Sequence, residues 1–248
     1  MSDAMKVIYI CFPEGKHKVL TMSYDDGKLA DRRLVSIFNH YGIKGTFHLN
    51  SGMHGPERIP SEEWKALYEG HEMSCHTVTH PTIARSPVEQ VAVQVLEDRR
   101  YIERIAGYPV RGLSYPNGSY NREIIELLPK LGIEYSRIVG NTDDFSMPEN
   151  YLAWEATCHH NHNLIENGKR FLELKKTQYM YMMYVWGHSY EFDRDNNWEL
   201  MEEFCEMMSG QEDIWYATNI QIVDYMKAAK NLRFTLDGDL VYLSLIHI

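Results

Sequence analysis

The sequence lacks several features that would assign it to a specialised class of protein. Only four of its 248 residues are cysteine, and no two of them form a Cys-x-x-Cys pair. Scattered thiols of this kind indicate a reduced, cytoplasmic chain rather than a disulfide framework. The sequence also contains no tandem repeat and no low-complexity tract, so neither a repeat array nor a disordered chain is expected.

Positive charge and long hydrophobic runs are scarce as well. The chain has 25 lysines and arginines against 35 aspartates and glutamates, a net charge of −10. This balance argues against nucleic-acid and membrane partners, but not against neutral sugars. No segment is long and apolar enough to span a membrane, and residues 7–12 are too short for the apolar part of a secretory leader. We therefore expect a cytoplasmic protein; the alternative is a leader that is missing from this sequence.

The apolar segments alternate between strand and helix patterns, which predicts an α/β fold. About seven βα units follow one another without a linker, as is typical of a single distorted (β/α) barrel of about seven strands. The predicted strands cover residues 19–24, 45–50, 72–76, 110–115, 133–139, 179–187 and 214–217, and the predicted helices cover residues 28–41, 61–69, 86–107, 122–131, 163–175, 198–208 and 220–230.

We expect this barrel to occupy residues 1–242 as one domain. Its last part, residues 232–240, has the pattern of a β-hairpin with an Asp-Gly turn. Residues 243–248 end abruptly in apolar side chains. We expect them to be a non-native or truncated tail; the alternative is a final β-strand.

Two adjacent aspartates, Asp25 and Asp26, follow an apolar run and precede Gly27. Like charges at the end of a strand repel each other, and a chain tolerates them best when a cation or a catalytic task separates their roles. The alternative is a solvated turn in which one aspartate caps the next helix.

Two histidines, His76 and His80, lie four residues apart on the loop that follows the third predicted strand. With one aspartate they complete a three-ligand set with an open position, which is typical of a hydrolytic metal site. Zn²⁺ suits this set, and Fe²⁺, Co²⁺ and Ni²⁺ are alternatives. Ordinary surface histidines are the other interpretation.

Two later segments also carry histidines. The uncharged strand 179–187 ends in Trp186-Gly187 and is followed by His188, at the strand end where barrels place their chemistry; a histidine hydrogen-bonded in the core is the alternative. Residues 158–162 hold three histidines beside a cysteine. Consecutive side chains point apart and converge poorly on a metal, so we expect a substrate-contacting loop that includes His160, or else a solvated polar loop.

Together these segments resemble the polysaccharide deacetylases with the NodB homology domain, carbohydrate esterase family 4. Residues 23–27 are similar to the family's Thr-Phe-Asp-Asp-Gly motif, residues 76–80 to His-(Ser/Thr)-x-x-His, residues 114–118 to Arg-x-Pro-Tyr and residues 186–188 to Leu-x-His. The family's Asp-x-x-Asp-Trp motif has no clear counterpart. The resemblance extends from about residue 19 to about residue 225.

The resemblance implies a role for each matching residue. Asp25 would be the general base, His188 the general acid, and Asp26, His76 and His80 the metal ligands. The backbone N–H of Asn117 would face the developing oxyanion, with Tyr115 and Trp186 near the substrate. One departure concerns the arginine that normally holds the base, because Ser114 stands in its place; Arg111 could substitute by reaching back.

The resemblance implies a metal-dependent hydrolase that removes acetyl groups from N-acetylated or O-acetylated carbohydrate. Two alternatives stay open at this point. The first is an amidase of the same barrel class acting on a small or cyclic non-sugar amide, which the expected cytoplasmic location favours. The second is a carbohydrate-binding pseudoenzyme, which the serine at position 114 and the unusual C-terminal residues favour.

Overall fold

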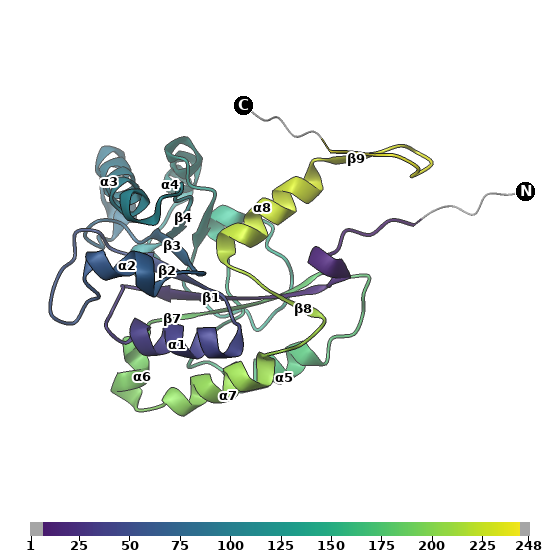
Figure 1. Ribbon diagram of the computed structural model, residues 1–248. Coiled ribbons are helices and arrows are strands. Elements are labelled where there is room, and N and C mark those ends of the chain that lie inside the picture. The colour runs from purple at the N-terminus through teal and green to yellow at the C-terminus, as the bar shows by residue number, and fades with distance from the viewer. Residues whose placement is uncertain (1–6, 244–248) are drawn as a thin grey trace, which may run out of the picture.

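The computed structural model describes residues 7–243, and its centre is a curled β-sheet in which every strand pair is parallel (Figure 1). The strands follow the order β5-β4-β3-β2-β1-β7-β6, and β8 pairs with the first residues of β1. Their bounds are β1 (Lys18–Asp25), β2 (Gly45–Leu49), β3 (Glu72–Cys75), β4 (Gly112–Ser114), β5 (Tyr135–Arg137), β6 (Cys158–His159), β7 (Tyr181–Gly187) and β8 (Ile214–Tyr216).

This sheet confirms the predicted distorted barrel. Seven strands form its continuous path, and within the described residues the two end strands, β5 and β6, do not pair with each other. The backbone ladder is therefore open on one side. A bridge between Arg137 and Trp154 lets an irregular segment cover the outer edge of β5 there.

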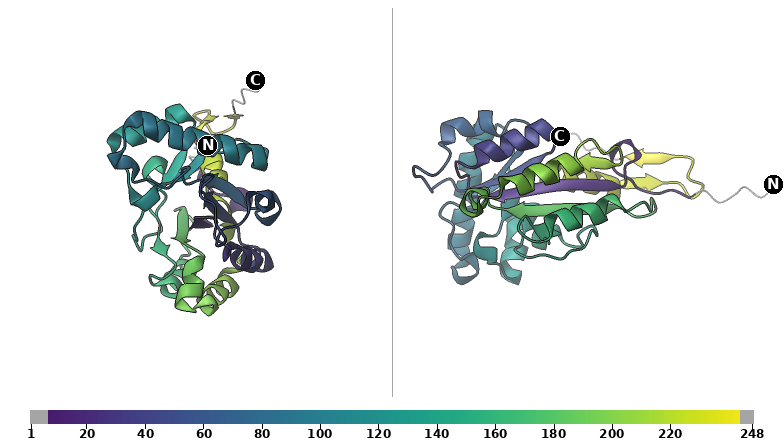
Figure 2. Two further views of the ribbon diagram at one scale, coloured as in Figure 1. Left: turned by 90° about the vertical axis from the view of Figure 1, so that its left-hand side faces the viewer. Right: turned by 90° about the horizontal axis from the view of Figure 1, so that it is seen from below.

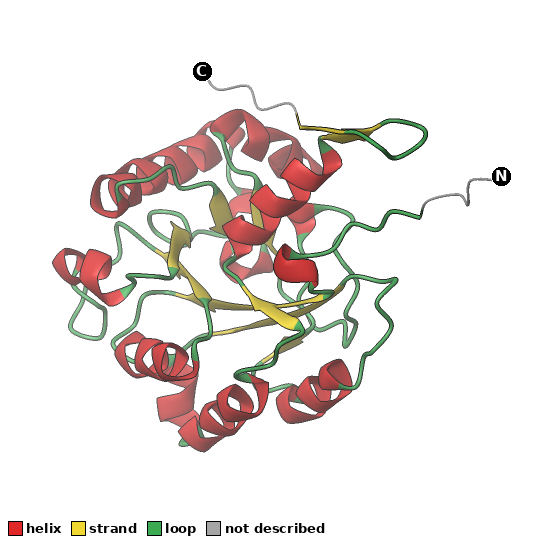
Figure 3. Ribbon diagram, turned by 45° about the vertical axis from the view of Figure 1, so that its right-hand side comes forward, coloured by secondary structure: helices red, strands yellow, loops and turns green. Residues whose placement is uncertain are grey.

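Helices surround the sheet, as Figure 3 shows with the strands in the centre. In Figure 1, α1, α5 and α7 lie on one side of the sheet and α3 and α4 on the other. None of the described helices combines the length and apolarity needed to cross a bilayer. The helices are α1 (Asp31–Tyr41), α2 (Ser61–Leu67), α3 (Val88–Ala106), α4 (Arg122–Leu127), α5 (Leu164–Leu172), α6 (Tyr190–Asp195), α7 (Trp198–Met208) and α8 (Asn219–Lys230).

The central strand β1 is buried along its whole length, because it is covered on both faces. Its partner β7 pairs with it over seven consecutive residues, which brings Tyr24 opposite Gly187. On the other side Asp25 pairs with His48 of β2. This register places the carboxyl ends of β1 and β7 at the same edge of the sheet, where barrels keep their chemistry.

A hairpin projects from the end of α8, away from the barrel (Figures 1 and 2). It consists of β9 (Leu232–Phe234) and β10 (Val241–Leu243), paired antiparallel, and Gly238 in its turn has a φ of 65°. The predicted hairpin is therefore confirmed. Of the expected non-native tail, Leu243 belongs to β10 and residues 244–248 lie outside the described residues, so the nature of the tail stays a prediction.

Candidate active site

The three predicted metal ligands converge at the carboxyl edge of the sheet. Asp26 follows β1 directly, and His76 and His80 lie on the loop after β3. Each offers one ligand atom, and these atoms all lie within 4.8 Å of one another. The set is compact enough for one cation, because metal–ligand bonds to nitrogen and carboxylate oxygen measure about 2 Å.

The imidazole of His76 is in the tautomer and charge state of a metal ligand. Its Nδ1 lies 2.8 Å from the carbonyl oxygen of Ser114, and a carbonyl only accepts, so the ring proton resides on Nδ1. The lone pair of Nε2 is then free, and this buried atom has no hydrogen-bond partner. Burial lowers the pKa of His76 and outweighs the opposing attraction of Asp25 and Asp26. The ring is therefore neutral, as a metal ligand must be.

The backbone around the ligands is held in a sparsely populated conformation. Asp26, Thr77 and His80 have φ values of 83°, 65° and 56°, a left-handed region that non-glycine residues adopt at a cost of about 1–3 kcal/mol each. Hydrogen bonds from the Asn50 side chain to the carbonyls of His76 (2.7 Å) and Thr77 (3.0 Å) hold this loop. Such strain is concentrated where side chains must be aimed for function.

Asp25, the predicted general base, is almost completely buried, with 3% of its surface exposed. Its Oδ2 atom accepts a hydrogen bond from Ser114 Oγ (2.9 Å) and forms an ion pair with Arg137 of β5. Burial is the largest single influence and alone would raise the pKa of Asp25, but the charges of Arg137, His76, His48 and His188 together outweigh it, so the pKa lies well below its usual range. Oδ1 has no hydrogen-bond partner and is available to accept a proton.

Arg137 is therefore the arginine that holds Asp25 where Ser114 replaces the usual one. The hypothesis that Arg111 does so is wrong. Arg111 does not reach Asp25, because its guanidinium binds Asp224 at 2.6 and 2.7 Å and Glu134 at 3.1 Å near the surface. Arg137 lies instead on β5, which pairs with the Ser114 strand β4. It also donates to Ser114 Oγ at 2.6 Å.

Trp186 supports this arginine rather than contacting solvent. Its ring centroid lies 4.4 Å from the guanidinium carbon of Arg137, a distance at which an arginine is attracted to an aromatic face. The indole N–H donates to the carbonyl of Gly140 (2.9 Å), and only 7% of the residue is exposed. Trp186 therefore holds the arginine that pairs with the predicted base, and its predicted contact with substrate stays a prediction.

His188, the predicted general acid, follows β7 and is partly exposed, with 22% of its side chain accessible. Its Nδ1 lies 3.6 Å from Oε2 of Glu191 on α6. Burial lowers the pKa of His188, but the carboxylates of Glu191, Asp25 and Asp26 outweigh it and raise the pKa above its ordinary value. The ring is thus biased toward the protonated form that an acid needs.

The side chains of two consecutive histidines, His159 and His160, also converge on Glu191. The expectation that these side chains point apart is therefore wrong. Nε2 of His159 lies 3.0 Å and Nε2 of His160 lies 3.3 Å from Oε2 of Glu191. Strand alternation does not apply to the pair because β6 ends at His159. The N–H of Asn161 donates to Nδ1 of His159 (3.1 Å), so the ring proton of neutral His159 resides on Nε2. The ligand atoms of His159, His160 and Glu191 lie within 4.8 Å of one another, close enough for one metal, but Nε2 of neutral His159 carries a proton and offers no lone pair to a second metal.

His160 does not contact substrate, because its side chain lies in the core with no exposed surface. Its ring stacks on Phe192 and on Tyr24, at centroid distances of 4.1 and 5.8 Å. Gly187 makes this possible, since a Cβ at that position would lie 2.0 Å from Nδ1 of His160. The predicted substrate role of His160 is therefore wrong.

The third motif occupies the loop after β4. Tyr115 is buried, donates to the carbonyl of Leu152 (2.7 Å) and stacks on Tyr120 with ring centroids 5.0 Å apart. Its side chain thus fixes the loop instead of lining an open site. Asn117 has a φ of 55°, the same left-handed conformation as Thr77 and His80. The predicted role of its backbone N–H stays a prediction.

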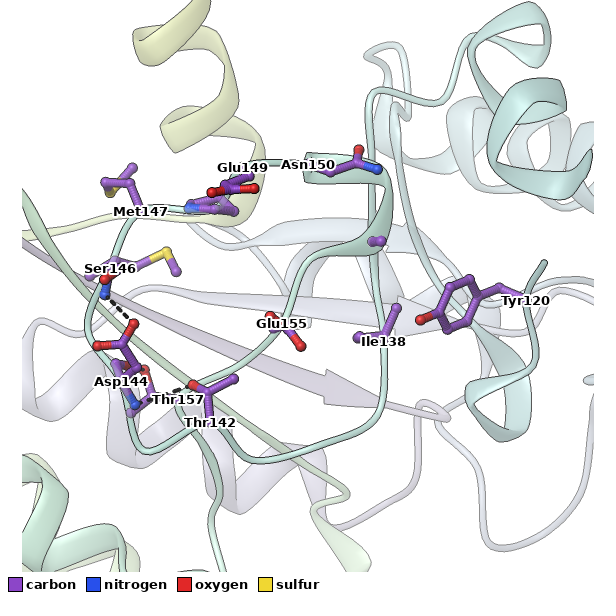
Figure 4. Close-up of a pocket in the computed structure, with 13 residues that line it drawn as sticks. Tyr120, Ile138, Thr142, Asp144, Ser146, Met147, Glu149, Asn150, Glu155 and Thr157 are labelled. Atoms are coloured by element: carbon purple, nitrogen blue, oxygen red, sulfur yellow. Dashed lines mark hydrogen bonds between the residues drawn. The ribbon is translucent and has the colours of Figure 1, made fainter. Parts of the chain in front are cut away.

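A cavity of about 540 Å³ lies among residues 138–157 (Figure 4). Asp144 and Glu155 line it, together with Tyr120 from another loop. None of the residues described above for the base, the acid or the metal lines this cavity. The candidate active site therefore lies outside this cavity, and its side-chain chemistry identifies it.

Comparisons with known proteins match this chain to one family. The family model described as polysaccharide deacetylase matches residues 12–136. A curated relative, peptidoglycan-N-acetylglucosamine deacetylase from Bacillus cereus, is 26% identical over 116 residues, which are 46% of this chain and 40% of that protein. The matched part of the chain thus spans less than half the length of this relative.

Solved structures are similar over most of the chain. An inferred polysaccharide deacetylase from Mycobacterium smegmatis superposes with a TM-score of 0.68 at 16% identity, covering 90% of this chain and 95% of that one. The PuuE allantoinase superposes with a TM-score of 0.65 at 13% identity, covering 88% and 92%. At such low identity these likenesses establish the fold alone.

Proposed function

Because this chain belongs to the polysaccharide deacetylase family, we propose that it is a metal-dependent hydrolase that removes acetyl groups from N-acetylated carbohydrate. The observation that carries the proposal is the division of labour between the adjacent aspartates. Asp26 lies with His76 and His80 in a compact ligand set, whereas Asp25 is paired with Arg137 and keeps one free oxygen. A binding module without chemistry has no need for this division.

Asp26, His76 and His80 would hold one divalent cation. Their donor set of two imidazoles and one carboxylate suits Zn²⁺, with Co²⁺, Ni²⁺ and Fe²⁺ as alternatives. The free, buried Nε2 of His76 supports this assignment, because it is otherwise an unsatisfied polar atom. A bound cation of this kind lowers the pKa of a water molecule and polarises a carbonyl group.

Asp25 would act as the general base. Its carboxylate is kept ionised by Arg137 and is fixed through Oδ2, so Oδ1 can accept the proton of the attacking water. His188, protonated through the influence of Glu191 and the aspartates, would donate a proton to the leaving amine. The backbone N–H of Asn117 would stabilise the negative charge on the acetyl oxygen.

The decisive experiment measures acetate released from N-acetylglucosamine oligomers by the purified protein, before and after chelation and after addition of Zn²⁺. We expect activity to disappear with the metal and to return with it, and Asp25→Asn to lower turnover about a hundredfold or more with metal content unchanged. Asp26→Asn should lower metal content itself, which separates the two neighbouring residues.

Two other results would redirect the proposal. Ring opening of a small cyclic amide without acetate release from sugars would establish an amidase of the same barrel class. Binding of the oligomers without turnover, with and without Zn²⁺, would establish a carbohydrate-binding pseudoenzyme. An acetylated xylan tested in parallel separates O-deacetylation from N-deacetylation.

A further inference from the structure

A cavity of about 480 Å³ opens beside Asp26, the proposed metal ligand. Its walls come from two loops and a helix at the carboxyl edge of the sheet: Lys28 follows β1, Glu57 follows β2, and Tyr190 and Asp193 belong to α6. The volume lies within the usual range of small-ligand sites, about 300–1,000 Å³. A group that fills this cavity is therefore adjacent to the metal centre.

One residue that lines the cavity, Tyr190, contacts the proposed acid. The ring of Tyr190 packs against the ring of His188 with their centroids 5.3 Å apart. Because His188 would protonate the leaving amine, the space beside it is where the sugar chain that carries this amine continues. Tyr190 offers an aromatic face with a polar tip, the combination that suits a pyranose ring.

The charge of the cavity is negative. The ammonium group of Lys28 lies 3.4 Å from a carboxylate oxygen of Glu57, so these two charges compensate each other, and it lies 5.8 Å from the centroid of the Tyr190 ring. Asp193 forms no ion pair with any lysine, arginine or histidine of residues 7–243. Instead, the indole N–H of Trp198 donates to its Oδ1 at 2.8 Å and fixes the carboxylate. A fixed and uncompensated carboxylate favours a cationic group in the space that it lines.

We propose that this cavity is a binding subsite for an amino sugar whose amine is already free. It would hold that sugar through Tyr190 and Asp193 while the neighbouring acetylated sugar lies at the metal. This inference rests on the proposed deacetylase function and refines its substrate to chains that are partly deacetylated.

The first test compares two substrates of the zinc-loaded protein: fully acetylated N-acetylglucosamine tetramer and a tetramer mixture with about half of its amines free. We expect kcat/KM per acetyl group to be about fivefold or more in favour of the second, since a charge-assisted contact that is partly exposed contributes about 1 kcal/mol. Asp193→Asn keeps the size of the side chain and an acceptor for Trp198, and it should abolish the preference.

The matched control is Glu199→Gln, which removes the same charge from an exposed position on α7 outside the cavity. This variant should retain the preference. The inference is overturned if the wild type shows no preference, if Asp193→Asn retains it, or if both variants lose it equally.

Binding of glucosamine dimer, measured by calorimetry, separates failure of this inference from failure of the proposed function. The dimer has no acetyl group, so its binding does not depend on turnover. Binding to the wild type that Asp193→Asn weakens about fivefold supports the subsite even if no acetate is ever released. Acetate release from both tetramers at equal rates, with no dimer binding, overturns the subsite and leaves the deacetylase intact.

Discussion

Replacement of Arg137 by methionine should disable Asp25 as a base, and the size of this effect follows from the burial of the pair. Both side chains are almost inaccessible, with 3% of Asp25 and 1% of Arg137 exposed. Two opposite charges about 4 Å apart attract by roughly 4 kcal/mol at an effective dielectric constant near 20. Loss of that attraction changes the equilibrium between ionised and protonated Asp25 about a thousandfold.

The direction of the pH effect is fixed by the same pair. Asp25 must be ionised to accept a proton, and its pKa is low because Arg137, the largest of the favourable charges, and the nearby histidines together outweigh the effect of burial. In Arg137→Met burial dominates, so the pKa of Asp25 rises. The acid limb of the profile of kcat/KM against pH should therefore move toward neutral pH, with the largest loss of activity on the acid side.

Arg111→Met is the matched control, because it removes an arginine whose partners, Asp224 and Glu134, lie near the surface. Its acid limb should coincide with that of the wild type. An unchanged acid limb in Arg137→Met, or an equal shift in both variants, would refute the reasoning. Should Arg137→Met fail to fold, Arg137→Lys keeps the charge without the paired contact to Ser114 and should shift the limb less.

Three further predictions concern other buried groups. Glu191→Gln should lower the pKa of His188 and move the alkaline limb of kcat/KM to lower pH with little change in KM; an unmoved limb contradicts the role of Glu191. Gly187→Ala should lower the free energy of unfolding by about 2 kcal/mol or more in chemical denaturation, because the new Cβ meets His160; unchanged stability contradicts this packing. Burial raises the pKa of Asp31 to about 7, so between about pH 4 and 7 the unfolded chain loses this proton before the folded chain does. The free energy of unfolding of the wild type should therefore fall by up to about 4 kcal/mol as pH rises through this range. Asp31→Asn should flatten this dependence on pH, and an unchanged dependence excludes Asp31 as its cause.

The parts of the fold that the sequence predicts well are those with a strong local pattern. The strand at 179–187 has no charged residue, and the structure contains β7 at Tyr181–Gly187 within it. Two elements were not predicted. β6 has only two residues, and α6 has six residues of which Phe192 alone is buried, so neither carries enough periodicity to be recognised.

The convergence of Asp26, His76 and His80 could be predicted because their spacing within each segment is informative. Arg137 could not, since its contact with Asp25 joins residues 112 positions apart. One signal was nevertheless present. The predicted strand 133–139 contains an arginine two residues after Tyr135, and the two side chains share the face of β5 that points into the barrel. A charged residue on that face needs a buried partner.

The contact of Glu191 with His159 and His160 could not be predicted from the sequence. The pattern at 158–162 predicts side chains that diverge, because consecutive side chains of a strand point to opposite faces. The strand ends at His159, and the contact of both imidazoles with Glu191 depends on a helix that starts after β7. Such a cluster follows from tertiary packing and has no signature in local sequence.

Because the sheet is open on one side, Arg137 also has a structural role. β5 is one end of the strand order, and β7 lies next to the other end. Arg137 extends from β5 to Asp25 on β1 and to the indole of Trp186 on β7. Side chains thus connect β5 with β1 and β7, to which no backbone ladder of the described residues joins it. A substitution that displaces β5 should consequently also change the ionisation of Asp25, which lies four places away in the strand order.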